Sequence, residues 1–359
     1  MGGFAASRGH DIISAQLTQA QSGASSSSGT PTPAATAASS PVSTDSQSLL
    51  ESARSLYAAG KLTEAEAEIR KLLEAQPDSA AGHYLLGHIL FDELHRTYEA
   101  KEQSEGQGFR YNSDVGKSLA EVRDAKAREI LAEFSAGAKY ASPAASDLKT
   151  VGLDYVLLRD NHSAEKWLAL GLKMDPKDPQ GWYFLGRTRY SQDEFASAIE
   201  AFEQCLTLDP RNVLAEANVG LSYEGLGQKD EATLAYQNAI AWEAQAAAKS
   251  PEPYIYLGRQ YLDQNQPDKA VPYLVQAVAD FPDVSTLHEQ LGKAYSTLHQ
   301  LPQAQGELEK AVALAPNVAS GHFLLGQVYR ELGMMEKAKA ELQKAGELNG
   351  THSSNQPPR

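Results

Sequence analysis

Three nearly identical decapeptides recur in distant parts of the chain. They read GHYLLGHILF from Gly82, GWYFLGRTRY from Gly181 and GHFLLGQVYR from Gly321. None of them contains an evident nucleophile, a pair of carboxylates or a cluster of metal ligands. Such segments predict a repeated structural unit rather than a catalytic site.

Prolines give the length of the repeat. Pro176 and Pro210 are 34 residues apart, and so are Pro282 and Pro316. Alignment on these prolines gives eight units, which start at residues 46, 80, 145, 179, 213, 251, 285 and 319. We number the residues of each unit from its first residue as places, so that Gly186 stands at place 8 of the fourth unit.

Small and aromatic residues recur at fixed places in these units. Place 8 holds alanine in the first unit and glycine in the others: Ala53, Gly87, Gly152, Gly186, Gly220, Gly258, Gly292 and Gly326. Place 20 holds alanine in seven units: Ala65, Ala164, Ala198, Ala232, Ala270, Ala304 and Ala338. Place 11 holds tyrosine in five units: Tyr155, Tyr223, Tyr261, Tyr295 and Tyr329. Three columns at one spacing indicate one repeated element.

This pattern resembles the tetratricopeptide repeat, whose 34-residue unit is a helix–turn–helix. The fourth unit carries most of the motif, with Tyr190 one place late: Trp182, Leu185, Gly186, Tyr190, Ala198, Phe202 and Pro210. The resemblance covers about 300 residues. It implies an all-α fold, an α-solenoid coiled as a right-handed superhelix of about eight such units, in a multi-repeat scaffold of bacterial type.

The residues themselves give a physical basis for this fold. In the seventh unit, His288, Leu291, Gly292 and Tyr295 follow the spacing of one stripe along an α-helix. Glycine on the first helix and alanine on the second allow the two helices to cross closely. A proline just past the second helix ends it. No unit can bury its stripe alone, so neighbouring units are expected to stack.

The repeats set the expected domain boundaries. Residues 1–45 are rich in Ser, Ala, Thr and Pro with few charges, so we expect a disordered tail. The solenoid is expected over 46–350, and a second disordered tail over 351–359.

Two units depart from the pattern. The second is interrupted near 96–116 by a polar, glycine-bearing stretch, which we interpret as a surface insertion in the turn between its helices. The alternative is a loop that contacts a partner, since long loops are often functional. The fifth unit lacks its closing proline, so its second helix is expected to extend towards Pro251.

Composition narrows the classes of partner. Forty-six acidic residues against 32 basic residues give a formal charge of −14, which argues against binding to nucleic acid. Cys205 is the single cysteine, so an intrachain disulfide and a multi-cysteine metal site are excluded. No stretch approaches the roughly 18 apolar residues of a membrane span. The N-terminus lacks the apolar run of a secretory signal, so we predict a cytoplasmic protein, or an exported, periplasmic one if the true start lies upstream.

Residue patterns that could carry chemistry are weak. Gly116, Lys117 and Ser118 match the end of a phosphate-binding loop, but Tyr111 stands where its first glycine is required. His83, His288 and His322 share place 4, where a packed histidine is expected rather than a metal ligand. We therefore predict no catalytic residues, no cofactor and no metal.

The leading function hypothesis is a non-enzymatic scaffold for a protein or peptide partner, whose identity the sequence does not give. In the family that the chain resembles, an extended peptide or a partner helix lies in a concave groove lined by places 2, 5, 6, 9 and 12 of the first helices. We predict that the groove is lined by Tyr183, Phe184, Arg187, Tyr190, Asn218, Tyr256, Arg259, Lys293, Phe323, Gln327 and Arg330. Aromatic rings beside guanidinium groups suit a peptide with apolar side chains and a carboxylate.

Other interpretations remain open at this point. One alternative is that the predicted groove residues are ordinary solvated side chains. Glu252, Asp263 and Glu289 make the surface mixed in charge rather than basic. The lysine–asparagine pattern of chaperone-tail clamps is not matched. The alternative function is an accessory subunit of an enzyme or of a cell-envelope assembly complex, possibly exported. A weaker alternative is a protein that binds a small ligand between its repeats.

Overall fold

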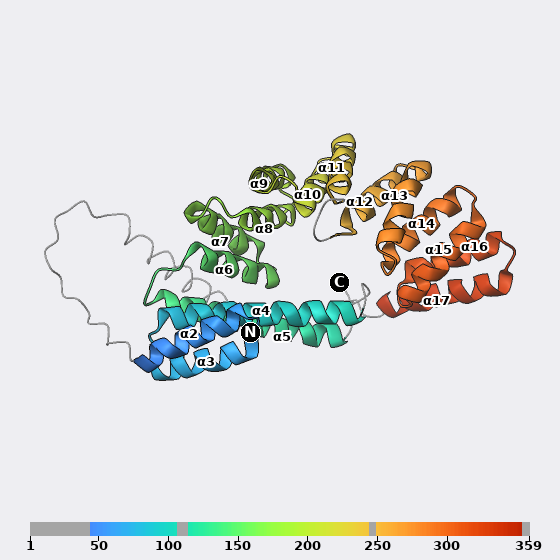
Figure 1. Ribbon diagram of the computed structural model, residues 1–359. Coiled ribbons are helices and arrows are strands. Elements are labelled where there is room, and N and C mark those ends of the chain that lie inside the picture. The colour runs from blue at the N-terminus through green and yellow to red at the C-terminus, as the bar shows by residue number, and fades with distance from the viewer. Residues whose placement is uncertain (1–43, 106–113, 244–248, 354–359) are drawn as a thin grey trace. The chain divides into compact units, whose positions relative to one another are not determined.

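The computed structural model describes residues 44–105, 114–243 and 249–353, in which the chain forms sixteen helices and no strand (Figure 1). This confirms the prediction of an all-α fold with about eight helix–turn–helix units. Most of the two tails predicted to be disordered, 1–45 and 351–359, lies outside the described residues.

The chain divides into two compact bodies. The N-terminal body contains residues 1–100 and 117–188, and the C-terminal body contains residues 101–116 and 189–359. The helices mainly in the N-terminal body are α2 (Thr44–Ala58), α3 (Leu62–Ala75), α4 (Ala80–Glu105), α5 (Asp114–Ala138), α6 (Ala145–Leu157), α7 (Asn161–Met174) and α8 (Pro179–Tyr190). The helices of the C-terminal body are α9 (Phe195–Leu208), α10 (Val213–Gly225), α11 (Lys229–Glu243), α12 (Glu252–Asp263), α13 (Pro267–Asp280), α14 (Ser285–Thr297), α15 (Leu301–Leu314), α16 (Ala319–Glu331) and α17 (Met335–Ser353).

Helices that follow each other in the chain pack as pairs. In the N-terminal body, α2 packs on α3 and α6 packs on α7. In the C-terminal body, each helix from α9 to α17 contacts the next one along the chain. The first helices α10, α12, α14 and α16 also contact one another in order. This is the stacking of an α-solenoid, and Figure 1 shows the antiparallel pairs.

The glycine column marks the closest crossing inside each pair. A Cβ atom added to Gly258 would lie 2.7 Å from Leu274 Cδ2, and one added to Gly326 would lie 2.7 Å from Leu342 Cγ. In both units the neighbour stands at place 24 of the second helix. The alanines at place 20 are all buried, as the close crossing requires. The small residues at place 27, Cys205 among them, are buried as well, which agrees with the prediction that this cysteine is a packed side chain.

The turn between the two helices has one backbone conformation throughout. Place 15 has a positive φ in seven units: Gly60, Arg159, Asp193, Gly227, Asn265, His299 and Gly333. An L-residue in this left-handed region costs roughly 1–2 kcal/mol, whereas glycine enters it freely. Four of the seven turns therefore carry backbone strain.

This strain gives a first prediction. We expect His299→Gly to raise the stability of the C-terminal body by about 0.5–1 kcal/mol, because His299 is exposed and has a φ of 57°. His299→Ala is the control, since alanine removes the same ring but keeps the Cβ atom. Urea unfolding of the wild type and the two variants measures this difference. Equal midpoints for the glycine and alanine variants would show that the backbone at position 299 is not strained.

Two helix ends, those of α4 and α17, differ from the expectations. The first helix of the second unit, α4, continues to Glu105, well into the stretch that we interpreted as an insertion. The described part of α11, the second helix of the fifth unit, ends at Glu243, and the extension that we expected towards Pro251 falls on residues 244–248, which lie outside the described residues. After them, the backbone amide of Ser250 donates a hydrogen bond to the Glu243 carboxylate. At the C-terminus, α17 runs to Ser353, three residues beyond the predicted end of the solenoid.

None of the helices within the described residues combines the length and the apolar character that crossing a membrane requires.

Candidate functional site

The candidate site is the face formed by places 5, 6, 9 and 12 of the first helices. In the C-terminal body these helices contact one another in order, so their residues at these places form one continuous surface. We call this surface the inner face. Seven of the predicted groove residues lie on α10, α12, α14 and α16: Asn218, Tyr256, Arg259, Lys293, Phe323, Gln327 and Arg330.

The predicted residues of the N-terminal body form a small cluster on α8. The rings of Tyr183 and Phe184 pack edge to face with centroids 5.4 Å apart. The guanidinium carbon of Arg187 lies 5.9 Å from the Tyr183 centroid, within the range of a cation–π contact. Arg187 is exposed, while both rings are partly buried.

Tyr190 belongs to the C-terminal body, although it ends the same helix. Its ring packs on Phe195 with centroids 5.4 Å apart. Burial raises the pKa of Tyr190, and the charge of Glu224 raises it further, with Arg259 acting in the opposite direction. The side chain is therefore part of a packed aromatic contact rather than a free donor.

Arg259 is paired within the protein. Its Nη2 donates to Glu224 Oε2 at 2.8 Å, and its guanidinium carbon lies 5.5 Å from the Tyr256 centroid. The hydroxyl of the buried Tyr236 donates to the same carboxylate oxygen at 2.8 Å. Burial acts to lower the pKa of Arg259, but Glu224 outweighs it and the pKa is raised. Much of the positive charge that we expected here is thus neutralised.

Glu224 was not among the predicted site residues. It stands at place 12 of the fifth unit, the place that supplies Tyr190 and Arg330 in other units. A list of the residues at place 12 of every unit would therefore have included Glu224. What the sequence does not show is that Arg259, on the next first helix, reaches across to it.

Lys293 also has an acidic neighbour. Glu289, one turn earlier on α14, accepts a hydrogen bond from Ser320 Oγ at 2.9 Å. Burial raises the pKa of Glu289, while the Ser320 bond and the charge of Lys293 lower it. The serine lies on α16, so this bond joins two first helices along the inner face.

Phe323 and Arg330 are the most available predicted residues of the inner face. They lie seven residues apart, about two helical turns, and therefore on one side of α16. Phe323 has 48% of its surface exposed. Arg330 is exposed, and no ion pair joins it to a carboxylate among the described residues. Gln327 lies between them and is partly buried.

Asn218 is directed along its own helix. Its Nδ2 donates to the backbone oxygen of Leu214 at 2.7 Å, a bond to the preceding turn. The amide oxygen is the part of this side chain that remains for another group.

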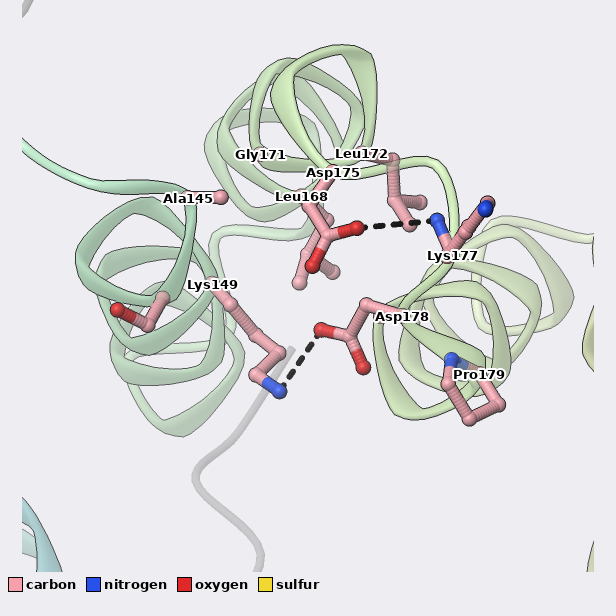
Figure 2. Close-up of a pocket in the computed structure, with 11 residues that line it drawn as sticks. Ala145, Lys149, Leu168, Gly171, Leu172, Asp175, Lys177, Asp178 and Pro179 are labelled. Atoms are coloured by element: carbon pink, nitrogen blue, oxygen red, sulfur yellow. Dashed lines mark hydrogen bonds and ion pairs between the residues drawn. The ribbon is translucent and has the colours of Figure 1, made fainter.

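A pocket in the N-terminal body is the candidate for a small ligand (Figure 2). It has a volume of about 340 Å³ and lies between α6, α7 and the start of α8. Lys149 and Asp178 approach each other from opposite walls, with Nζ and Oδ2 2.8 Å apart. Asp175 accepts from the Lys177 amide at 3.1 Å.

Two of the charged side chains that line this pocket, Lys149 and Asp178, are thus paired with each other. None of its lining residues has a buried, unpartnered polar atom within the described part of the chain. The described residues likewise contain no group of three or more His, Cys, Asp or Glu side chains placed to hold a metal ion.

Family comparisons agree with this geometry. Residues 50–96, 179–212 and 319–352 each match the tetratricopeptide repeat family. These segments fall in units that the proline alignment defines, and each of them contains one of the three decapeptides completely.

The chain contains tetratricopeptide repeats.

Two curated proteins show what this repeat protein is similar to. It is 32% identical over 74 residues to the human PEX5-related protein, which covers 21% of this chain and 12% of the human protein. It is 30% identical over 174 residues to the cytochrome c-type biogenesis protein CycH of Pseudomonas aeruginosa, which covers 46% of this chain and 40% of CycH. The chain thus spans less than half the length of either relative.

Among solved structures, PilW, described as a type IV pilus biogenesis factor, matches with a TM-score of 0.48 and 20% identity. The match covers 55% of this chain and 90% of PilW.

Proposed function

We propose that this tetratricopeptide repeat protein is a non-enzymatic scaffold whose inner face binds an extended peptide or a partner helix. The exposed Phe323 beside Arg330 on α16 is the observation that carries the proposal most directly. Aromatic and arginine side chains are enriched among residues that dominate binding energy. Tyr256 and Arg259 extend this surface on α12, and Tyr183, Phe184 and Arg187 supply a similar cluster on α8.

The charge pairs along the inner face refine the expected partner. Glu224 pairs with Arg259, and Glu289 lies beside Lys293, whereas Arg330 has no such ion pair within the described part of the chain. We therefore expect a carboxylate of the partner to bind Arg330, which can donate two parallel hydrogen bonds to it. An apolar side chain of the partner belongs against Phe323.

The test begins with a partner isolated by pull-down and identified by mass spectrometry. We expect Arg330→Gln to weaken its binding by about tenfold or more, which corresponds to about 1.4 kcal/mol. Arg259→Gln should weaken binding less, because that guanidinium already holds Glu224. Affinity is measured by calorimetry with the full chain.

Glutamine is chosen over glutamate because a glutamate at position 259 would face Glu224 and strain the fold. Lys269→Gln, an exposed lysine on the second helix α13, is the matched control and should bind as the wild type does. If the double variant Arg259→Gln, Arg330→Gln keeps its melting temperature and its full affinity, the inner face is not the binding site.

The second candidate is an accessory subunit of an enzyme or of a cell-envelope assembly complex. The 30% identity with CycH, a cytochrome c-type biogenesis protein, favours it. Isolation of the native protein separates the two candidates. Recovery in a stable complex with an enzyme, in the envelope fraction, supports the accessory subunit. Recovery alone, outside the envelope fraction, supports the independent scaffold.

A further inference from the structure

Three histidines at place 4 make the same pair of contacts. Nδ1 of His83, His288 and His322 lies 2.7, 2.6 and 2.6 Å from a glutamate oxygen on the second helix of the same unit. Nε2 of each ring lies 2.9 Å from the backbone oxygen of the proline that closes the preceding unit. The glutamates and prolines are, in order, Glu133 and Pro77, Glu307 and Pro282, and Glu341 and Pro316.

Both nitrogens of each ring therefore face groups that accept hydrogen bonds. A neutral imidazole carries one N–H, whereas the protonated ring carries two. A proline carbonyl can only accept, and so can an ionised carboxylate. Each of these trios is fully hydrogen-bonded only when its histidine is protonated.

The alternative, a neutral ring beside a protonated glutamate, conflicts with the surroundings of Glu307. Lys310 Nζ lies 2.9 Å from its other carboxylate oxygen. Burial acts to raise the pKa of Glu307, but the bonds from His288 and Lys310 outweigh it and hold the pKa below its usual value. Glu307 is therefore ionised, and its carboxylate accepts from His288 Nδ1.

Other side chains show that this arrangement is specific. Trp182 stands at place 4 of the fourth unit, and its single N–H donates to the Pro176 oxygen at 3.0 Å. Place 23, which holds the glutamate in the seventh and eighth units, is Ala201 there. His88, at place 9, faces Asp147 with Nε2 and the Thr150 hydroxyl with Nδ1. A hydroxyl can donate to a neutral ring, so His88 does not require a second proton.

We propose that His83, His288 and His322 are proton-dependent staples between neighbouring repeats. Each protonated ring ties its own first helix to the second helix of the unit and to the closing turn of the preceding unit. The stability that a staple contributes is present while the ring is protonated and is lost as the pH rises through the range in which histidine gives up its proton.

Among the described residues, the charged group that each ring contacts is the glutamate of its trio. His288 faces Glu307, and Lys310 lies on the far oxygen of that carboxylate. His322 faces Glu341, and His83 faces Glu133. The third side of each ring is the proline carbonyl, which does not titrate.

The test uses the full chain and glutamate-to-glutamine variants. An amide at position 307 or 341 can donate to a neutral Nδ1, so these variants keep the trio hydrogen-bonded without the proton. Between about pH 6 and about pH 9, the melting temperature of the wild type should fall by about 2–5 °C more than that of the double variant Glu307→Gln, Glu341→Gln. Glu309→Gln is the matched control, because Glu309 accepts from the Tyr329 hydroxyl and from Gln305 instead of a histidine.

Nitrogen NMR of the histidine rings provides a readout that packing alone would not move. At about pH 7, where a free histidine is mostly neutral, we expect three rings of the wild type to be protonated on both nitrogens and two of them to become neutral in the double variant. Single-protonated rings at all three positions in the wild type would overturn the proposal. A melting curve whose pH dependence is the same in the double variant, the control and the wild type would overturn it as well.

Discussion

Replacing Gly258 with leucine is expected to destabilise the C-terminal body by about 1–3 kcal/mol. Gly258 stands at place 8 of α12, where the helix crosses α13 most closely. A Cβ atom at this position would lie 2.6 Å from Gln290 Oε1 and 2.7 Å from Leu274 Cδ2. Gln290 is itself held, because its Nε2 donates to the backbone oxygen of Ile255 at 3.1 Å. Both neighbours would have to move to admit even a methyl group.

Gly306 offers a matched control for the same substitution. It lies within α15, and a Cβ atom added there would meet no atom within 4 Å. Gly306→Leu should raise stability slightly, since leucine favours a helix over glycine by roughly 0.8 kcal/mol. Urea unfolding measures both variants. Equal midpoints for Gly258→Leu and the wild type would show that the glycine column does not mark tight crossings.

Replacing Asp154 with serine is expected to stabilise the N-terminal body by about 2–4 kcal/mol at about pH 9. Asp154 is fully buried, and neither carboxylate oxygen has a hydrogen-bond partner among the described residues. Burial raises its pKa to about 8 from the usual 3.8. Ser222 stands at the same place of the fifth unit, where its hydroxyl donates to the backbone oxygen of Asn218 at 2.8 Å. A serine at position 154 can make the corresponding bond.

The gain from this substitution should depend on pH. Because the folded chain binds a proton at Asp154 more tightly than the unfolded chain, stability falls as the pH rises from about 4 to about 8 and is flat above that range. The gain in unfolding free energy from Asp154→Ser should therefore be small at about pH 4 and should grow to a plateau above about pH 8. Melting temperatures measured across this range test the slope.

Ser222→Asp is the converse variant. It places a carboxylate at a fully buried position of the C-terminal body, so it should lower stability and introduce the same pH dependence. If Asp154→Ser lowers the melting temperature at about pH 9, the buried carboxylate has a stabilising partner outside the described residues.

The repeated places of the sequence predicted the packing well. Glycine at place 8 and alanine at place 20 are small because helices cross there, and that steric cause lies within a single unit. The backbone conformation of the turns was not predicted from the sequence. Arg159 and His299 adopt the left-handed conformation that Gly60 adopts, because packing of the two helices fixes the turn whatever residue stands at place 15.

The extension of α4 was misread for a different reason. Its residues 99–105 read EAKEQSE, which we took as loop because they are polar. Glutamate, alanine, lysine and glutamine are strong helix formers, so a polar stretch of this kind continues a helix well. A segment without an apolar stripe is exposed to solvent, but it can still be helical.

The candidate site was predicted only in part. The places of the inner face follow from helical geometry, and the structure puts the predicted residues of the C-terminal body on it. The pairing of Arg259 with Glu224 was missed because it joins two units, and spacing within one unit does not report such a contact. Contacts of this kind decide which cations remain available to a partner.

The pattern of helix contacts has a consequence for how this chain folds. In the C-terminal body, helices touch the next helix in the chain or the next first helix, so contacting residues are close in sequence. The entropy lost in closing a loop grows with the length of that loop, and here each turn closes only a few residues. Folding can therefore begin at any helix pair and spread outward, and its speed should depend little on the number of repeats.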